Sequence, residues 1–556
     1  MLTFDPKQQQ QNTRPVEYPW VLLLLAFVWL WPGVIHRDLW NLEPALYSSI
    51  LHIQQENNVF ISNNYGETFF PNMPVYLWCA TAFHQLSIFF PMSGYTAARL
   101  ATTLFIVLSL LTIGGAGREL LGRYHGRSVV LILIGCPGVL VIGHSLDTTV
   151  MLFTAFCSFI YGIALSRRKT IFGGLLIGIS WLLAFWSGNV PPLFFLWLIT
   201  VLLPFSSEWR TRRYLRAITL ALFIALPLLP ILPLLLKHYN PTAFQFWLDH
   251  HIFGIFGGIS QHHIGFSPIK LIKNLLWFAL PAWLIALWTI HRRKILTHAT
   301  GWFCLTWLIT SSIILIFQQD NDNRQLIWLI PPLALMGAAG LDDIKRGIAA
   351  FFNWFGLLIF GFSALFLWFM FFAINYGVPA KLAQWASRFN PYFSPDWNYF
   401  PMILALSFTP IWLWAVTRRH IRGRKAITNW AAGITLIWTI LLSLFLPWIE
   451  SLKSYRPIAE DIIQNAPATL IEQLQTGKEC IDSDSISLLT ALEEYGQITT
   501  LFHTTTDNAR CHYRITTPHN GALDIPDNAQ VLWNGTRGKR GKETIVLFVN
   551  PNTTEH

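Results

Sequence analysis

The chain has 556 residues, of which 53% are hydrophobic and only 12% are charged. Soluble globular proteins carry about one quarter charged residues, so the composition excludes a cytosolic multidomain enzyme and a disordered chain and indicates a polytopic membrane protein. The net charge of +10 is unevenly spread, because residues 1–447 hold 30 Lys and Arg against 15 Asp and Glu, whereas residues 448–556 hold 9 against 14. We therefore expect a transmembrane domain over 1–447 and a small domain over 448–556.

Apolar stretches long enough to cross a bilayer follow one another along the first of these regions. A transmembrane helix needs about 20 mostly apolar residues. Thirteen stretches come close to this length: 18–35, 97–117, 128–146, 148–165, 171–187, 189–206, 217–237, 271–290, 299–317, 325–341, 350–375, 399–417 and 428–447. They predict a polytopic α-helical protein with about thirteen transmembrane helices.

The segment 75–92 is also apolar, and the basic residues decide where it is placed. If it does not cross and the N-terminus is cytoplasmic, six short cytoplasmic loops carry 20 of the 30 Lys and Arg of the transmembrane region, as the positive-inside bias requires. If it crosses, the same charges lie outside. We therefore expect 75–92 to lie along the outer face, within an outer-face loop that covers 36–96. An ordinary span paired with another, missed span is the alternative.

This orientation explains the positive charge without nucleic acid as a partner, and it places 448–556 outside the membrane. Cys480 and Cys511 are the only two cysteines of that region. Because exported domains lie in an oxidising compartment, we predict a Cys480–Cys511 disulfide. Helix-like and strand-like runs predict a small α/β domain: 470–476, 485–495, 498–501, 512–516 and 544–549.

Acidic residues near the membrane are the first candidates for function, since a carboxylate next to hydrocarbon is costly. Asp147 is the only acidic residue between Glu119 and Glu208. It lies at the outer end of the third predicted span, where capping the next helix is an equally good explanation. Glu43 lies in the long outer segment 36–74. Loops of that length are usually functional, although a solvated acid at a helix start gives the same pattern.

Several short motifs follow one another around these acids. In chain order they are Trp40-Asn41-Leu42-Glu43 with Tyr47, Gly66 to Trp78 (which contains Pro71-Asn72-Met73-Pro74-Val75-Tyr76), Leu146-Asp147, His250-His251-Ile252, Gln261-His262, and Arg324-Gln325-Leu326 leading to Pro331-Pro332-Leu333. Their order and spacing resemble the GT-C glycosyltransferases that use polyprenyl-phosphate sugars, in particular the lipid A 4-amino-4-deoxy-L-arabinose transferase and protein mannosyltransferase-like group. Where that family has an aspartate in the first motif and a lysine in the second, this chain has Glu43 and Asn72.

The resemblance implies a GT-C fold of about thirteen transmembrane helices with a small exported C-terminal domain. It also implies a reaction that breaks the bond between a sugar's anomeric carbon and a polyprenyl phosphate. Cations or a metal must then receive the phosphate, and a carboxylate positions or deprotonates the acceptor. We expect Glu43 and Asp147 to be the catalytic carboxylates and Arg324 to clamp the phosphate. A structural ion pair of Arg324 with Asp320 or Asp322 is the alternative.

Further candidates follow from the same comparison. The expected substrate-binding residues are Arg324, Asn72, Tyr76, His251, His262 and Lys270. A divalent metal ion is the one cofactor that the chemistry leaves open, with Glu43 and His251 as its candidate ligands. The loop histidines are equally well explained as polar surface, and Lys270 as an interfacial anchor.

The implied function is an inverting glycosyltransferase, an enzyme that moves 4-amino-4-deoxy-L-arabinose or a related sugar from a polyprenyl phosphate to lipid A. The expected location is the bacterial inner membrane, with the N-terminus cytoplasmic, the C-terminal domain periplasmic, and membrane lipids as surroundings. Two alternatives stay open. One is the same fold acting on another exported glycan or a protein hydroxyl, and the other is a non-catalytic binder or transporter of polyprenyl lipids.

Overall fold

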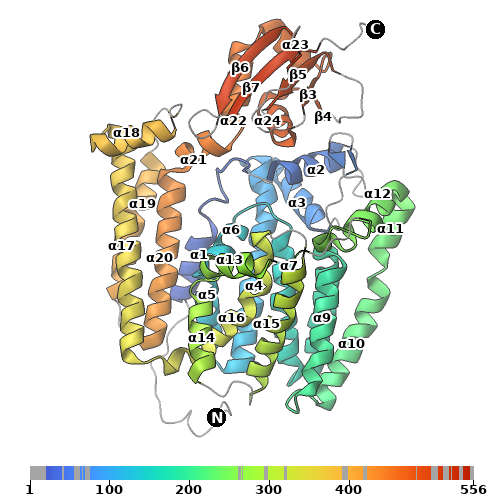
Figure 1. The fold of residues 1–556 in the computed structure, drawn as a ribbon, viewed down its shortest axis with the longest axis vertical. Helices are drawn as coiled ribbons and strands as arrows, with labels where there is room; N and C mark the ends of the chain where they lie inside the picture. The colour runs from blue at the N-terminus through green and yellow to red at the C-terminus, as the bar shows by residue number, and fades with distance from the viewer. Residues whose placement is uncertain are drawn as a thin grey trace.

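The computed structural model describes the molecule as a bundle of long helices with a smaller unit of helices and strands at one end (Figure 1). The described residues are 20–40, 43–55, 63–64, 67–68, 75–260, 265, 267–292, 298–318, 322–390, 393, 399–417, 422–483, 485–502, 511–517, 525–526, 529–537 and 543–550.

Each of the thirteen predicted spans contains a helix, but not all of these helices have the length of a span. The bundle helices are α1 (Trp20–Leu30), α4 (Gly94–Leu121), α5 (His125–Ile134), α6 (Pro137–Ile142), α7 (Thr149–Ser166), α8 (Thr170–Gly188), α9 (Val190–Leu202), α10 (Arg212–Leu228), α11 (Ile231–Tyr239), α13 (Pro268–Phe278), α14 (Ala282–Arg292), α15 (Ala299–Phe317), α16 (Ile330–Gly340), α17 (Arg346–Tyr376), α19 (Tyr399–Thr417) and α20 (Arg422–Leu444). Within the described residues, seven helices are long and apolar enough to cross a membrane, or eight if one bent pair is a single span. The protein is therefore a polytopic helical membrane protein, and the count of thirteen crossings is not confirmed.

The bent pair corrects one predicted span. The stretch 271–290 was expected to be one helix, but α13 and α14 meet at an angle of 104°. Pro281 lies between them, and proline cannot donate the backbone hydrogen bond that a continuous helix needs. As a result α13 lies across the bundle whereas α14 runs along it (Figure 1).

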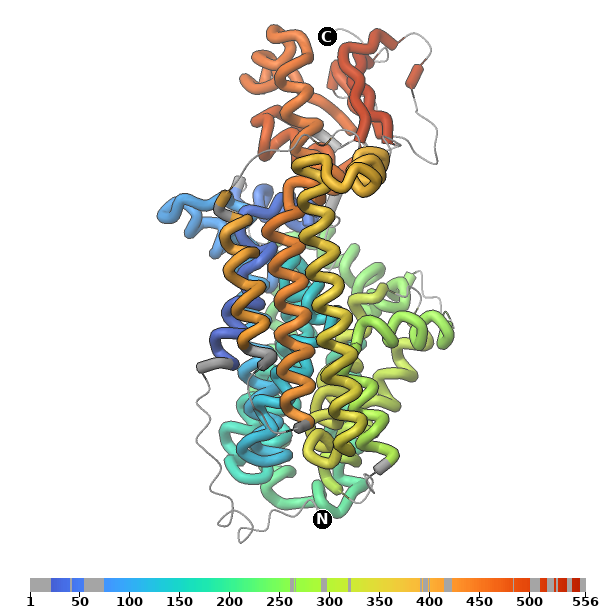
Figure 2. The backbone as a smooth tube through the Cα atoms, turned by 90° about the vertical axis from the view of Figure 1, so that its left-hand side faces the viewer, coloured from blue at the N-terminus to red at the C-terminus, as the bar shows by residue number. Residues whose placement is uncertain are grey.

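The surface of the bundle is as apolar as a lipid-facing surface must be. Along α17, for example, Phe351, Trp354 and Phe362 are each exposed by more than 60%. Figure 2 shows α17, α19 and α20 standing side by side as a separate group of long helices, and their mutual packing forms its own apolar cluster. A larger apolar cluster fills the remainder of the bundle.

Two short helices lie between the bundle and the C-terminal unit (Figure 1), namely α2 (Glu43–Gln55) and α3 (Val75–Leu86). With 12 residues, α3 extends about 18 Å, which is too short for a hydrocarbon core of about 30 Å. The turn η2 (Ser87–Phe89) follows it and exposes Ile88 and Phe89 by 82% and 77%. These features agree with a segment 75–92 that does not cross.

The C-terminal unit is an α/β structure with its own apolar core. Its helices and strands are α22 (Arg456–Asn465), α23 (Ala468–Gln475), β3 (Ile481–Ser483), α24 (Ile486–Gly496), β4 (Thr500–Phe502), β5 (Tyr513–Thr516), β6 (Val531–Arg537) and β7 (Glu543–Val549). The sheet has the order β4-β3-β5-β7-β6, in which β3 pairs in parallel with β4 and β5, and β7 pairs antiparallel with β5 and β6. Cys480 and Cys511 are joined by a disulfide between the segments that lead into β3 and β5.

Two connections hold this unit against the bundle. The short helix α21 (Leu446–Lys453) links α20 to α22. On the other side α24 packs on α2, where Tyr47 donates a hydrogen bond to Glu494 at 3.1 Å. The unit therefore rests directly on the helix that begins at Glu43.

Candidate functional site

A cavity of about 380 Å³ opens between the segment that leads into α2, the end of the bundle next to the C-terminal unit, and α21. Its polar and charged lining residues are Arg37, Trp40, Glu43, His144, Ser145, Asp147, Asp322, Arg324, Trp438 and Lys453. Its apolar lining residues are Val141, Leu146, Leu441, Leu442 and Ile449. Three residues that the sequence singled out from distant motifs, Glu43, Asp147 and Arg324, thus line one cavity.

Glu43 is the first residue of α2 and is buried among hydrogen-bond donors. Its Oε1 atom accepts from Arg37 Nη2 at 2.5 Å, from Arg99 Nε at 3.2 Å and from the backbone N–H of Leu146 at 2.7 Å. Its Oε2 atom accepts from Arg99 Nη2 at 3.3 Å and from the backbone N–H of Trp40 at 2.8 Å. Five donor contacts leave this carboxylate no free position for a substrate proton.

The charge state of Glu43 follows from these contacts. Burial by itself would raise the pKa of this carboxyl, but the positive charges of Arg37 and Arg99 and the two backbone N–H groups lower it below its usual value. Glu43 is therefore an anion at neutral pH. It is better suited to ordering two arginines than to accepting a proton.

Asp147 caps the helix that follows it and also reaches the cavity. Its Oδ1 atom accepts from the backbone N–H of Thr149 at 2.8 Å and from the Thr149 hydroxyl. Its Oδ2 atom accepts from Arg324 Nη1 at 3.3 Å. The helix-cap explanation and the functional explanation thus apply to different oxygen atoms of one side chain, and Oδ2 keeps a lone pair for a further partner.

Arg324 lies in η7 (Asn323–Trp328) and is held by two carboxylates. Besides Asp147, its Nε atom donates to Asp322 Oδ2 at 2.6 Å and its Nη2 atom lies 2.5 Å from the same oxygen. The ion pair with Asp322, an alternative at the level of the sequence, is therefore present. Because 35% of the Arg324 side chain remains exposed, an anionic ligand can still approach the guanidinium from the cavity.

The other predicted residues have varied positions. Tyr76 is fully buried, with its hydroxyl 2.7 Å from Thr102 Oγ1 and accepting from the backbone N–H of Asp147 at 3.1 Å. Through this hydrogen bond Tyr76 holds the backbone of Asp147, and it does not line the cavity. Lys270 lies on α13 with its side chain exposed. The predicted residues Asn72 and His262 lie outside the described residues.

The sequence suggests His251 as a metal ligand together with Glu43. His251 ends η4 (Trp247–His251), lies with its ring 5.4 Å from that of Phe246, and does not line the cavity. Burial and the neighbouring His250 lower its pKa to about 4. The described residues contain no group of three His, Cys, Asp or Glu suited to a metal ion. With its oxygens occupied by arginines, Glu43 does not fit the metal role in this arrangement, and the Glu43–His251 pair as metal ligands stays a prediction.

Reasoning from the sequence either missed three cations of the site or gave them no role. Arg99 of α4 is 0% exposed, and besides Glu43 it donates to the backbone carbonyls of Arg37 and Asp38 at 2.5 and 2.7 Å. An arginine within an apolar span was the available signal. Arg37 and Lys453 line the cavity, but they come from a loop and from the far end of the bundle, and no local pattern links them.

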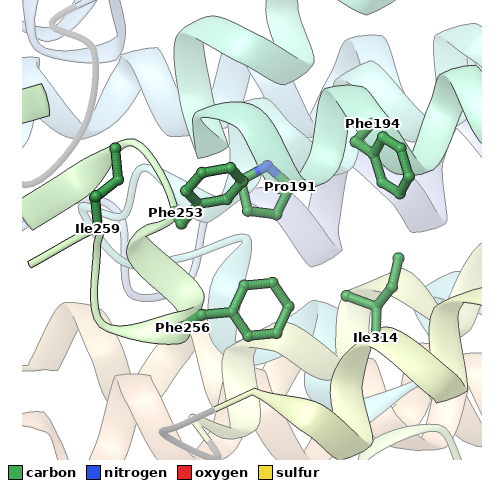
Figure 3. Close-up of a pocket in the computed structure, with 6 residues that line it drawn as sticks. All are labelled: Pro191, Phe194, Phe253, Phe256, Ile259 and Ile314. Carbon is green, nitrogen blue, oxygen red and sulfur yellow. The ribbon is translucent and has the colours of Figure 1, made fainter. Parts of the chain in front are cut away.

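A second cavity of about 490 Å³ is almost wholly apolar. Figure 3 shows its lining residues, Pro191, Phe194, Phe253, Phe256, Ile259 and Ile314. They come from the beginning of α9, from α15 and from the segment around η5 (Gly254–Phe256). Such a surface fits hydrocarbon rather than a sugar or a phosphate.

Comparisons with known proteins show the fold. No family model matches the chain, and neither does any curated protein sequence. Among solved structures, ArnT from Cupriavidus metallidurans in the apo state is similar, with a TM-score of 0.64 and 14% identity over 97% of this chain and 99% of that one. The same values hold for ArnT from that organism bound to undecaprenyl phosphate. An oligosaccharyltransferase of Archaeoglobus fulgidus in the apo form has a TM-score of 0.43 at 13% identity, over 88% of this chain and 65% of that one.

The similarity to ArnT extends over nearly the whole length of both chains. The chain therefore has the fold of ArnT, which is the GT-C fold that the motifs in its sequence indicated.

Proposed function

We propose that the protein is an inverting glycosyltransferase that moves a sugar from a polyprenyl phosphate to an acceptor at the outer face of the bacterial inner membrane. One observation carries the proposal: a single cavity at the outer end of a GT-C fold holds Arg37, Arg324 and Lys453 together with the carboxylate of Asp147. Phosphate departure needs cations, and the acceptor needs a carboxylate or a charge of its own.

The proposed reaction forms a bond from an acceptor oxygen to the anomeric carbon and breaks the bond from that carbon to the phosphate oxygen. Attack from the side opposite the phosphate inverts the anomeric centre. Negative charge grows on the leaving phosphate, and Arg324 is the best placed guanidinium to receive it because its side chain stays partly exposed. Asp147 Oδ2 is the carboxylate oxygen with capacity to orient the acceptor or to accept its proton. Glu43 keeps Arg37 and Arg99 in position.

The donor class rests on the fold and on the second cavity. ArnT with the same fold is described bound to undecaprenyl phosphate, and the apolar cavity around Phe253 and Phe256 offers a polyprenyl chain a surface to pack on. We propose undecaprenyl phosphate as the carrier, 4-amino-4-deoxy-L-arabinose or a related sugar as the group transferred, and lipid A as the acceptor. The N-terminus would then be cytoplasmic, and residues 448–556 a periplasmic domain.

Lipid A profiles test the substrate and the acceptor. Mass spectrometry of lipid A from cells with and without the gene is expected to show an added aminopentose only when the protein is present. An unchanged profile would favour another exported glycan or a protein hydroxyl as the acceptor, which glycan and protein mass spectrometry would then identify.

Two variants test the site in membranes. Asp147→Asn is expected to lower sugar transfer about 100-fold or more, and Glu43→Gln is expected to disturb the arginines. The matched control is Glu472→Gln, at an exposed position of α23. Full activity in both site variants would contradict this site. Undiminished binding of undecaprenyl phosphate without transfer to any acceptor would favour the non-catalytic lipid binder. The carboxylate of Glu43, whose hydrogen-bonding positions are all occupied, is compatible with that alternative.

A further inference from the structure

Lys453 is the last residue of α21, and it lines the cavity together with Glu43, Asp147 and Arg324. It follows α20, the last long helix of the bundle, whereas Glu43 follows α1, the first. Lys453 is exposed, so a ligand that enters the cavity can reach it.

The surroundings of Lys453 differ from those of the other cations in the cavity. Arg37 is paired with Glu43, and Arg324 with Asp147 and Asp322. For Lys453 the described residues provide no carboxylate within ion-pair distance; its contact is instead with the indole of Trp40, where Nζ lies 5.0 Å from the ring centroid. Partial burial and the charge of Arg37 lower the pKa of its ammonium, although the charge of Glu43 acts to raise it.

Trp40 brings two positive charges close together. The Cζ atom of Arg37 lies 4.5 Å from the centroid of the same ring. Each cation gains from the negative π face. The carboxylates of Glu43 and Glu450 relieve their mutual repulsion only in part, because the oxygens of Glu43 are already engaged and Glu450 also faces Asp38. An anion placed beside Lys453 and Arg37 would remove this repulsion.

The helix that carries Lys453 is held in place by contacts from three directions. The side chain of Asn390 donates to Ser451 Oγ at 2.5 Å, and Glu450 accepts from the backbone N–H of Asp38 at 2.8 Å. Arg537 of β6 donates to the backbone carbonyl of Lys453 at 3.0 Å. These contacts fix the backbone of α21, and the indole of Trp40 places the ammonium, so the cation is preorganised for a ligand.

We infer that Lys453, with its ammonium held over Trp40, contacts the phosphate of the polyprenyl carrier directly, so that a residue of the helix leading to the C-terminal unit completes the donor site. This inference rests on the proposed function and adds to it a substrate-binding residue and a role for the C-terminal connection. Lys453 contributes a charge and takes no part in the transfer of a proton.

Binding to the full-length protein tests this inference without requiring sugar transfer. Undecaprenyl phosphate is titrated against the purified protein in lipid nanodiscs, with undecaprenol as the phosphate-free probe. Lys453→Met is expected to raise the Kd for undecaprenyl phosphate about 10-fold or more, since a charge-assisted contact is lost, and to leave undecaprenol binding unchanged. Lys453→Arg is expected to retain most of the affinity. The control is Lys478→Met, which removes an equal charge at an exposed position in the C-terminal unit.

The outcomes separate the two levels of the proposal. An unchanged Kd in Lys453→Met overturns the role of Lys453 and leaves the proposed function in place. A loss of lipid A binding without any loss of undecaprenyl phosphate binding also overturns it, because Lys453 would then serve the acceptor. Normal donor binding without transfer to any acceptor overturns the proposed function but not the role of Lys453. A wild-type protein that binds no undecaprenyl phosphate overturns both.

A second measurement covers a Lys453→Met protein that fails to fold. In the wild-type protein, amine labelling followed by peptide mass spectrometry is expected to show Lys453 protected by undecaprenyl phosphate and not by undecaprenol. Lys478 serves as the internal control. Equal labelling of Lys453 with and without the phosphate would contradict the contact.

Discussion

Arg99 of α4 and Glu43 of α2 form a buried pair with two contacts, 3.2 Å from Nε to Oε1 and 3.3 Å from Nη2 to Oε2. The same guanidinium binds the backbone carbonyls of Arg37 and Asp38. One side chain of the bundle thus fixes both the course of the segment that leads into α2 and the carboxylate that holds the arginines of the cavity.

This pair predicts a large loss of stability when Arg99 is removed. Arg99→Met leaves Glu43 with one guanidinium in place of two and frees several buried carbonyls, which is expected to cost about 3–5 kcal/mol. Arg99→Lys is expected to recover only part of it, because an ammonium cannot make the forked contact. Thermal unfolding in detergent measures the effect. Arg388→Met, at an exposed position of α18 (Ala380–Phe389), is the control, and a melting temperature equal to the control's would contradict the structural role of Arg99.

Arg324 predicts a defect in donor binding with little loss of stability. Because its side chain is about one third exposed, Arg324→Lys is expected to fold normally. Its KM for the donor is expected to rise about 10-fold or more, since a guanidinium can contact two phosphate oxygens where an ammonium contacts one. Arg388→Lys is the matched control. A lower kcat with an unchanged donor KM would show that Arg324 does not bind the donor in its ground state.

The carboxyl of Glu450 predicts a pH effect where α21 meets the segment that leads into α2. Burial and the charge of Asp38 raise its pKa to about 7, against the backbone N–H of Asp38 and the positive charges of Arg456 and Arg37, which lower it. The folded protein therefore keeps a proton that the unfolded chain, with an ordinary glutamic acid, releases at lower pH. The free energy of unfolding must then fall as the pH rises from about 5 to about 7, by at most about 1.4 kcal/mol per pH unit.

A neutral substitute tests this directly. Glu450→Gln is expected to lose less stability than the wild type between pH 5 and pH 8, so that the two proteins differ most at the high end. The measurement is thermal unfolding at a series of pH values, with Glu472→Gln as an exposed control. Parallel curves for the variant and the wild type would show that Glu450 does not titrate in this range.

The sequence singled out three charged residues that line one cavity of the structure, whereas it did not predict the shape of the bundle. Glu43, Asp147 and Arg324 stand out because charges at the edge of an apolar span are costly, and their motifs hold them at recognisable spacings. The 104° bend between α13 and α14 depends on how α13 packs across other helices, which hydropathy cannot reveal. The same limit applies to Lys453, since its place over Trp40 arises only when the two ends of the transmembrane region meet.

The donors around the two site carboxylates predict that catalysis does not need a divalent metal. The oxygens of Glu43 accept hydrogen bonds from Arg37, Arg99 and two backbone N–H groups. One oxygen of Asp147 accepts from Thr149, and the other accepts from Arg324. A cation at Glu43 would have to displace a buried guanidinium, and a cation at Asp147 Oδ2 would lie beside the positive charge of Arg324. Sugar transfer by purified protein is therefore expected to persist in EDTA and not to rise with added Mg²⁺ or Mn²⁺. Activity abolished by EDTA and restored by a single divalent ion would contradict this assignment and would require a different arrangement of the site in the working enzyme.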